Sequence, residues 1–130
     1  MKKIAETDLY VIWVDSLKNR LYQEVRGKWI APVANYHYEQ DVEKALPLLR
    51  KDFTILNNAL KAEGVMSPEW AVIAKKIRQR LVNDGMRASA ELLPENVLTH
   101  MQLKRVSKET HFKTRFFSDR KEAEAWLDSL

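Results

Sequence analysis

Ser67 is the residue whose position best suits a chemical role, because it stands directly before a predicted helix. Free backbone N–H groups and the helix dipole favour an anion at such an end, so a phosphate on the Ser67 hydroxyl would be stabilised there. The same hydroxyl can instead cap the helix by accepting a backbone hydrogen bond, which contributes about 1 kcal/mol. Since Pro68 follows and suits the first helical position, we favour the cap.

Side chains that carry catalysis or bind metals form no recognisable pattern in this sequence. There is no cysteine, so disulfides, thiol catalysis and thiolate metal sites are excluded. His37, His100 and His111 lack the i, i+4 spacing of a helical metal site, and neither HExxH nor GxSxG occurs. The three glycines are too few for a phosphate-cradling loop. We therefore expect a protein that is not an enzyme, with no cofactor and no bound metal.

Basic side chains on the same predicted helix are the next candidates. Lys75, Lys76, Arg78 and Arg80 line its outer side and flanks. Nucleic-acid binding would need exposed aromatic residues or a groove-reading helix beside them, but the nearest aromatic residue, Trp70, falls on the apolar stripe. We therefore expect a solvated face and no nucleic-acid partner.

One apolar residue interrupts this polar face. Val72 lies on the same outer side as Lys75 and Lys76, and Met66 stands in the adjoining loop. A single exposed valine is common in folded proteins. Together with Met66, however, Val72 is a candidate for a patch that contacts a partner.

The elements that position these residues are a helix over 68–84 and a strand over 88–93. Ser67 suits the N-cap of this helix, and Gly85 suits the first residue after its end. Apolar residues recur on one helix face at Trp70, Ile73, Ala74, Ile77 and Leu81. Because the helix leads directly into a strand rich in small residues, the sequence indicates a helix that lies on a sheet.

The rest of the chain continues this alternation of strands and helices. The other predicted strands are residues 10–14, 21–29, 53–56 and 112–117, and the other predicted helices are residues 38–49, 95–109 and 119–130. Pro47 lacks the N–H of an interior helical residue, so the helix over 38–49 should kink or end there. The resulting order, β-β-α-β-α-β-α-β-α, predicts an α/β layer fold with a largely parallel sheet.

Length and composition indicate one globular domain over residues 1–130. No segment approaches the roughly 20 apolar residues of a membrane span, and the N-terminus lacks the apolar stretch of a signal peptide. We therefore expect a cytoplasmic protein without a transmembrane segment. The net charge of +4 arises in residues 71–130, and we interpret this excess as a contribution to solubility.

Four strings along the chain resemble the SpoIIAA-like family, which belongs to the STAS-domain group related to anti-sigma-factor antagonists. They are DFTILNN, GVMSPEW, ASAELLPEN followed by MQLKRV, and FFSDRKEAEAWL, and the resemblance extends over residues 10–130. It implies a mixed, four- to five-stranded sheet with helices mostly on one face. It also implies a bacterial regulatory or binding protein.

The resemblance further directs attention to the start of the central helix. Antagonist members carry a phosphorylated serine there, within an Asp-Ser-Ser-Gly type of motif. Here Asn57 or Asn58 replaces the aspartate, the Ser-Ser-Gly is absent, and Ser67 alone remains, followed by Pro68. This departure argues against a phosphoswitch in this chain.

Two functional hypotheses follow from these observations. The first is a non-enzymatic STAS-like binding or regulatory module that acts through the loop 57–67 and the first half of the following helix. Its candidate residues are Asn58, Met66, Ser67, Val72, Lys75 and Lys76. The alternative is a small carrier or membrane-surface protein that holds an apolar, lipid-like ligand beneath its helices. The resemblance favours this alternative, because SpoIIAA-like proteins are grouped with lipid-carrier-like domains. A homodimer through the edge of the first hairpin also stays open.

Overall fold

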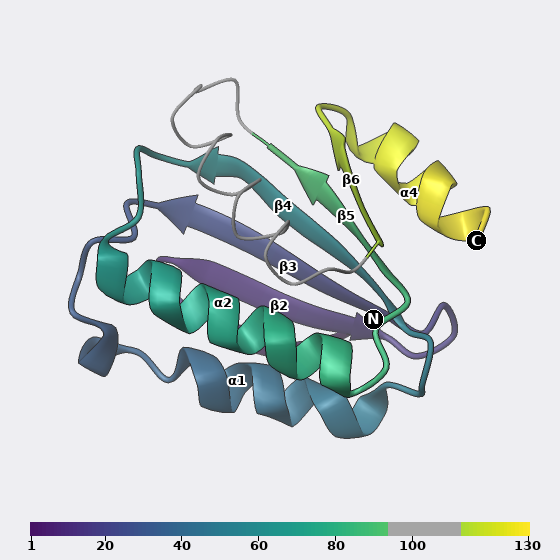
Figure 1. Ribbon diagram of the computed structural model, residues 1–130, viewed down its shortest axis with the longest axis horizontal. Coiled ribbons are helices and arrows are strands. Elements are labelled where there is room, and N and C mark those ends of the chain that lie inside the picture. The colour runs from purple at the N-terminus through teal and green to yellow at the C-terminus, as the bar shows by residue number, and fades with distance from the viewer. Residues whose placement is uncertain (94–112) are drawn as a thin grey trace.

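A computed structural model describes residues 1–93 and 113–130 of the chain, and a six-stranded sheet forms its centre (Figure 1). The strands lie side by side in the order in which they occur along the chain. They are β1 (Lys2–Glu6), β2 (Tyr10–Asp15), β3 (Arg20–Gly27), β4 (Thr54–Ala62), β5 (Ala88–Leu92) and β6 (Lys113–Phe117). The pairs β1–β2 and β2–β3 are antiparallel, whereas β3–β4, β4–β5 and β5–β6 are parallel. The mixed, largely parallel α/β sheet predicted from the sequence is thus confirmed.

The sheet has one strand more than predicted, because β1 precedes the first predicted strand. Lys2, Lys3 and Glu6 of β1 are exposed, so the segment lacks the apolar alternation that marks a strand. Charged residues of this kind are typical of an edge strand, where they discourage pairing with another molecule.

The first predicted hairpin is confirmed, but its edges are not free. Tyr10 pairs with Val25 and Asp15 with Arg20, as expected for adjacent antiparallel strands. The outer side of β2 is paired with β1, and the outer side of β3 with β4. The hairpin edge that we considered for a homodimer therefore lies inside the sheet.

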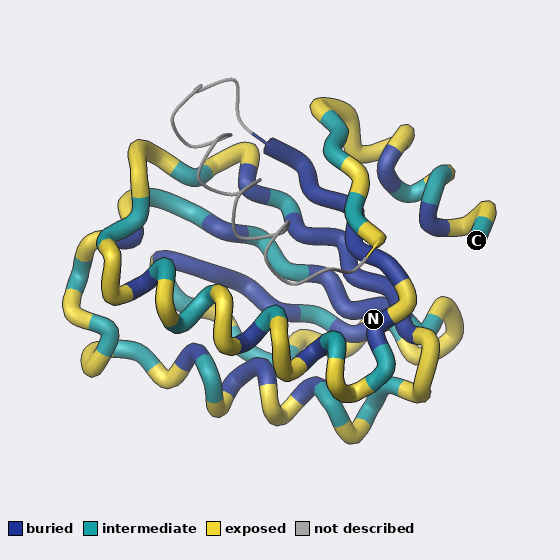
Figure 2. The backbone as a smooth tube through the Cα atoms, in the orientation of Figure 1, coloured by how far each residue is buried: buried dark blue, intermediate teal, exposed yellow. Residues whose placement is uncertain are grey.

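Helices cover both faces of the sheet among the described residues. The helices α1 (Tyr38–Ala45) and α2 (Pro68–Asn83) pack on one face, where residues such as Ile12, Leu21 and Ile55 form the larger core. The helix α4 (Arg120–Asp128) packs on the opposite face through Ala123 and Leu127. Figure 2 shows the buried middle of the sheet and the exposed outer sides of α1 and α2. The predicted helix over 95–109 lies outside the described residues.

Two predicted boundaries change for identifiable reasons. The helix predicted over 38–49 ends at Ala45, because Pro47 occupies the short 3-10 turn Leu46–Leu48 that follows it. The strand predicted over 53–56 continues as β4 to Ala62, so residues 57–62 of the predicted loop 57–67 are strand. Its two asparagines favour turns by composition, yet the backbone at Asn57 and Asn58 pairs with the strands on both sides.

A buried arginine attaches α4 to the sheet. Arg20, only 3% exposed, forms ion pairs with Glu124 and Asp128 of α4, and its Nε donates to Thr54 Oγ1 at 2.9 Å. The hydrogen bond from Arg20 lowers the pKa of Asp128. At the start of the helix, Glu122 N–H donates to Asp119 Oδ2, so Asp119 caps α4.

Within residues 1–93 and 113–130, no helix combines the length and apolar character needed to cross a membrane.

Candidate functional site

The six predicted site residues do not form one site. Met66, Ser67 and Val72 lie along the loop before α2 and the first turns of that helix. Lys75 and Lys76 are exposed further along α2, and Lys76 forms an ion pair with Glu39 of α1 at 3.2 Å.

Asn58 is separated from the other five residues by the sheet itself. It lies on β4 beside Trp13 and Tyr22, on the face that α4 covers, and its Oδ1 accepts a hydrogen bond from Leu60 N–H at 3.0 Å. Alternation along β4 instead directs the preceding residue, Asn57, towards α2. The prediction that Asn58 belongs to the same surface is therefore wrong.

Ser67 caps α2 as predicted. Its Oγ accepts a hydrogen bond from Trp70 N–H at 3.3 Å, and Pro68 is the first helical residue. The backbone N–H of Ser67 donates to Trp29 O at 2.9 Å, which ties the start of α2 to the segment after β3.

The loop before α2 and the segment after β3 together carry exposed apolar side chains. Ile30 is 62% exposed, Val65 42% and Val72 66%. We call Ile30, Val65, Met66, Ser67 and Val72 the sheet-end surface, because they lie on the segments that follow β3 and β4 and on the first turns of α2. These segments come together at one end of the sheet (Figure 1). Ile30 and Val65 were not among the predicted site residues, since a lone apolar residue in a loop carries no periodic signal.

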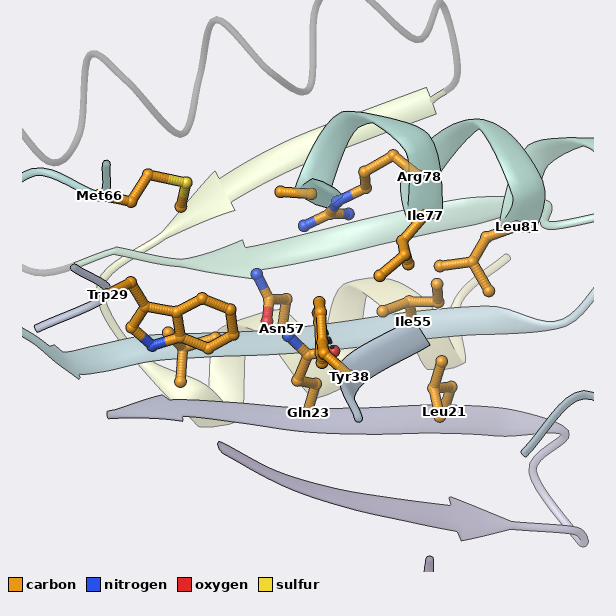
Figure 3. A pocket seen from close by; sticks show the side chains of 12 residues that line it. Leu21, Gln23, Trp29, Tyr38, Ile55, Asn57, Met66, Ile77, Arg78 and Leu81 are labelled. Carbon is orange, nitrogen blue, oxygen red and sulfur yellow. Dashed lines mark hydrogen bonds between the residues drawn. The ribbon is translucent and has the colours of Figure 1, made fainter. Parts of the chain in front are cut away.

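A cavity of about 50 Å³ lies between α2 and the sheet (Figure 3). Its walls are mostly apolar, with Trp29 and Met66 at one end and Leu21, Ile55, Ile77 and Leu81 at the other. Gln23, Tyr38 and Asn57 lie between these two ends, and Arg78 of α2 lies above them.

The polar residues of the cavity belong to a row across three strands. Gln23, Asn57 and Glu91 are paired in register on β3, β4 and β5. Tyr38 OH donates to Gln23 Oε1 at 2.8 Å, and burial raises the pKa of Tyr38 to about 12, so its hydroxyl stays protonated at neutral pH.

At the β5 end of the row, a buried ion pair joins the sheet to α2. Arg78 pairs with Glu91, a residue that is 1% exposed, and also donates to Ser89 Oγ at 3.0 Å. Ser89 Oγ in turn donates to Glu91 Oε1 at 3.1 Å. Asn57 Oδ1 and Glu91 Oε2 are buried and have no hydrogen-bond partner in the described part of the chain.

Trp29 and Tyr38, which line the cavity, belong to a larger cluster of aromatic side chains. Trp70 lies 4.5 Å from Trp29 and 5.7 Å from Tyr36, measured between ring centroids, and Tyr38 lies 4.9 Å from Tyr10. Trp29 and Trp70 are both buried in this cluster.

Within residues 1–93 and 113–130, the structure gives no support for a metal site that contains histidine. His37 is exposed before α1, and no group of three acidic or histidine side chains in these ranges could hold a metal ion. His100 and His111 lie outside the described residues.

The whole arrangement of strands and helices matches a known crystal structure. That structure is an uncharacterized protein of the DUF3478 family with a SpoIIAA-like fold from Shewanella loihica PV-4. The TM-score is 0.63 with 16% sequence identity, and the match covers 95% of this chain and 97% of that one. This chain has a SpoIIAA-like fold.

The SpoIIAA-like fold that the resemblance implied is thereby confirmed, at an identity that establishes the architecture alone. Searches with family models and against curated proteins found no match.

Replacing Ser67 separates its role as a cap from any role as a switch. We expect Ser67→Ala to lower the free energy of unfolding by about 0.5–2 kcal/mol, because Trp70 N–H loses its acceptor. Ser67→Asp restores an acceptor and adds a charge that the helix dipole favours, so its stability should match or slightly exceed the wild type. Urea unfolding followed by circular dichroism measures both. Equal stability of Ser67→Ala and wild type would show that the cap contributes nothing.

Proposed function

We propose that this SpoIIAA-like chain is a non-enzymatic binding or regulatory module that recognises a protein partner through the sheet-end surface. The observation that carries this proposal is the exposure of Ile30, Val65 and Val72 at one end of the molecule. Solvated apolar side chains on neighbouring segments are typical of a contact surface rather than of a closed core.

The surroundings of these side chains fit a protein partner. Exposed charges of both signs, Lys28, Glu63 and Glu69, stand on the same segments. An apolar centre with a polar rim is the usual composition of a protein–protein interface. The two acidic residues also make an anionic membrane surface a less favourable partner.

The surface is preorganised by hydrogen bonds. Ser67 N–H donates to Trp29 O at 2.9 Å, Glu63 N–H donates to Gly27 O at 2.9 Å, and Trp70 Nε1 donates to Ala31 O at 2.8 Å. A surface held in this way loses little conformational entropy on binding. The engagement of Ser67 as a cap favours binding that does not depend on phosphorylation.

The alternative, a carrier of a lipid-like ligand, has weaker support. The cavity beneath α2 measures about 50 Å³, whereas pockets for drug-sized apolar ligands span roughly 300–1,000 Å³. A lipid chain would require α2 to move away from the sheet, and the Arg78–Glu91 ion pair opposes that movement.

Capture of partners from a lysate of the source organism tests the proposal. Val65→Asp and Val72→Asp place charges within the sheet-end surface, and we expect each to reduce the captured partner at least tenfold. Leu17→Asp is the matched control, because Leu17 is 97% exposed in the turn between β2 and β3, at the opposite end of β3. Quantitative mass spectrometry compares the three variants with wild type.

All three substitutions replace exposed side chains, so thermal unfolding should stay close to that of the wild type. Capture that is equally strong with Val65→Asp, Val72→Asp and Leu17→Asp would refute the proposed surface. Failure of the wild type to enrich any protein above an unrelated control would refute the proposed function.

A further inference from the structure

We infer that the cavity beneath α2 binds a small uncharged molecule that carries a carboxamide or hydroxyl group, with Asn57 as the residue that recognises it. This site is separate from the sheet-end surface and does not depend on the protein partner proposed above. It rests on three observations: the cavity, an unpartnered polar atom in its wall, and a polar lining in which the charge of Arg78 is paired with Glu91.

The unpartnered atom is Asn57 Oδ1. Asn57 is 5% exposed and lines the cavity from β4, yet its Oδ1 has no hydrogen-bond partner among the described residues. A buried polar atom without a hydrogen-bond partner is energetically unfavourable. Such a cost is tolerated where a ligand supplies the missing hydrogen bond. Because Asn57 Oδ1 is an acceptor, the ligand must carry a hydrogen-bond donor.

Neighbouring groups define the rest of the polar environment. The Gln23 side chain lies beside Asn57 in register, and its Oε1 already accepts a hydrogen bond from Tyr38 OH. Two side-chain amides next to each other offer both donors and acceptors. A ligand group that combines a donor with an acceptor is complementary to them, and carboxamides and hydroxyls are the smallest groups of this kind.

The charge balance excludes an ionic ligand. The charged side chain in the cavity wall, Arg78, is paired with Glu91, and the other polar residues, Gln23, Tyr38 and Asn57, are neutral at pH 7. An ion entering the cavity would lose its hydration without gaining a counterion, which is strongly unfavourable. A neutral ligand avoids this cost.

The volume of the cavity limits how much of the ligand can enter it. An engineered apolar cavity of about 150 Å³ holds benzene, so a volume of about 50 Å³ suits a group of a few heavy atoms. The apolar walls, including Leu21, Ile55 and Ile77, would contact a methyl or methylene group attached to the polar end.

Acetamide and acetate are the probes for this site, because they share one heavy-atom skeleton and differ in charge and in the presence of a donor. We would titrate each into the isotope-labelled protein and follow the side-chain amides of Gln23 and Asn57, the indole N–H of Trp29 and the methyl groups of Ile55 and Ile77. We expect saturable shifts at these positions with acetamide and none with acetate.

Two variants of adjacent asparagines identify the recognising residue. Asn57→Leu conserves volume but removes the acceptor, and we expect it to weaken acetamide binding at least tenfold. Asn58→Leu alters the neighbouring residue, which lies on the face of the sheet opposite the cavity, and should leave acetamide affinity within twofold of wild type.

The inference is overturned if acetate shifts these resonances as acetamide does, if acetamide gives no saturable shift, or if Asn57→Leu binds acetamide like wild type. Should Asn57→Leu fail to fold, the comparison of acetamide with acetate on the wild-type protein still decides. None of these outcomes depends on whether a protein partner is captured, so the two proposals can fail separately.

Discussion

Replacing Trp70 with alanine is expected to lower the free energy of unfolding by about 3–5 kcal/mol. The side chain is fully buried, contacts Trp29 and Tyr36 edge-on, and donates a hydrogen bond to Ala31 O. Its removal leaves a large void where α2 meets the sheet and breaks the hydrogen bond to Ala31 O. Urea unfolding monitored by far-UV circular dichroism measures the loss.

Val72→Ala is the matched control for Trp70→Ala. Val72 lies two residues further along the same helix but is 66% exposed, so its truncation should change stability by no more than about 0.5 kcal/mol. If Trp70→Ala and Val72→Ala had similar stabilities, the aromatic cluster would not hold α2 on the sheet.

Glu91→Leu is expected to cost about 3–5 kcal/mol, because it leaves the Arg78 guanidinium without its buried counterion. The double variant Arg78→Met with Glu91→Leu removes both charges and should recover most of this loss, since an apolar pair of similar volume often replaces a buried ion pair without penalty. Chemical unfolding of wild type, both single variants and the double variant gives the coupling energy directly.

An exposed pair provides the control for this cycle. Arg80 of α2 lies 3.5 Å from Glu43 of α1, and both side chains are 51% exposed. Glu43→Leu should therefore change stability by less than about 1 kcal/mol. The losses of unfolding free energy in Arg78→Met and Glu91→Leu could instead simply add in the double variant, with no recovery of stability. That result would contradict the assignment of a coupled buried pair.

The helix α2 could be predicted to within a residue because its ends are determined locally. Ser67 and Pro68 mark its start, and Gly85 adopts a φ of +102°, a left-handed conformation that glycine accepts and other residues rarely do. A Cβ added at Gly85 would also approach Lys51 Cγ to 2.9 Å. Ser67, Pro68 and Gly85 each lie within a few residues of the helix end that they mark.

The polar row beneath α2 could not be predicted in the same way. Gln23, Asn57 and Glu91 are far apart in the sequence, and only the register of two parallel strand pairs brings them together. No local pattern specifies that register. The asparagines of β4 also favour a loop by composition, and a shift of one position decides whether Asn57 or Asn58 faces α2.

The sequence predicted three residues of the sheet-end surface, Met66, Ser67 and Val72. It did not predict Ile30 or Val65. The loop before α2 was recognised from the helix start that follows it. The contribution of Ile30 depends on the hydrogen bond from Ser67 N–H to Trp29 O, which joins segments more than thirty residues apart in the sequence.

The strand order has a consequence for how this chain folds as it leaves the ribosome. Each described strand pairs with the one before it, from β1 to β6. Synthesis from the N-terminus therefore always presents a new strand to an edge that already exists, and no pairing must wait for a later strand. The sheet can grow in one direction during translation, while exposed edges that invite aggregation are covered one after another.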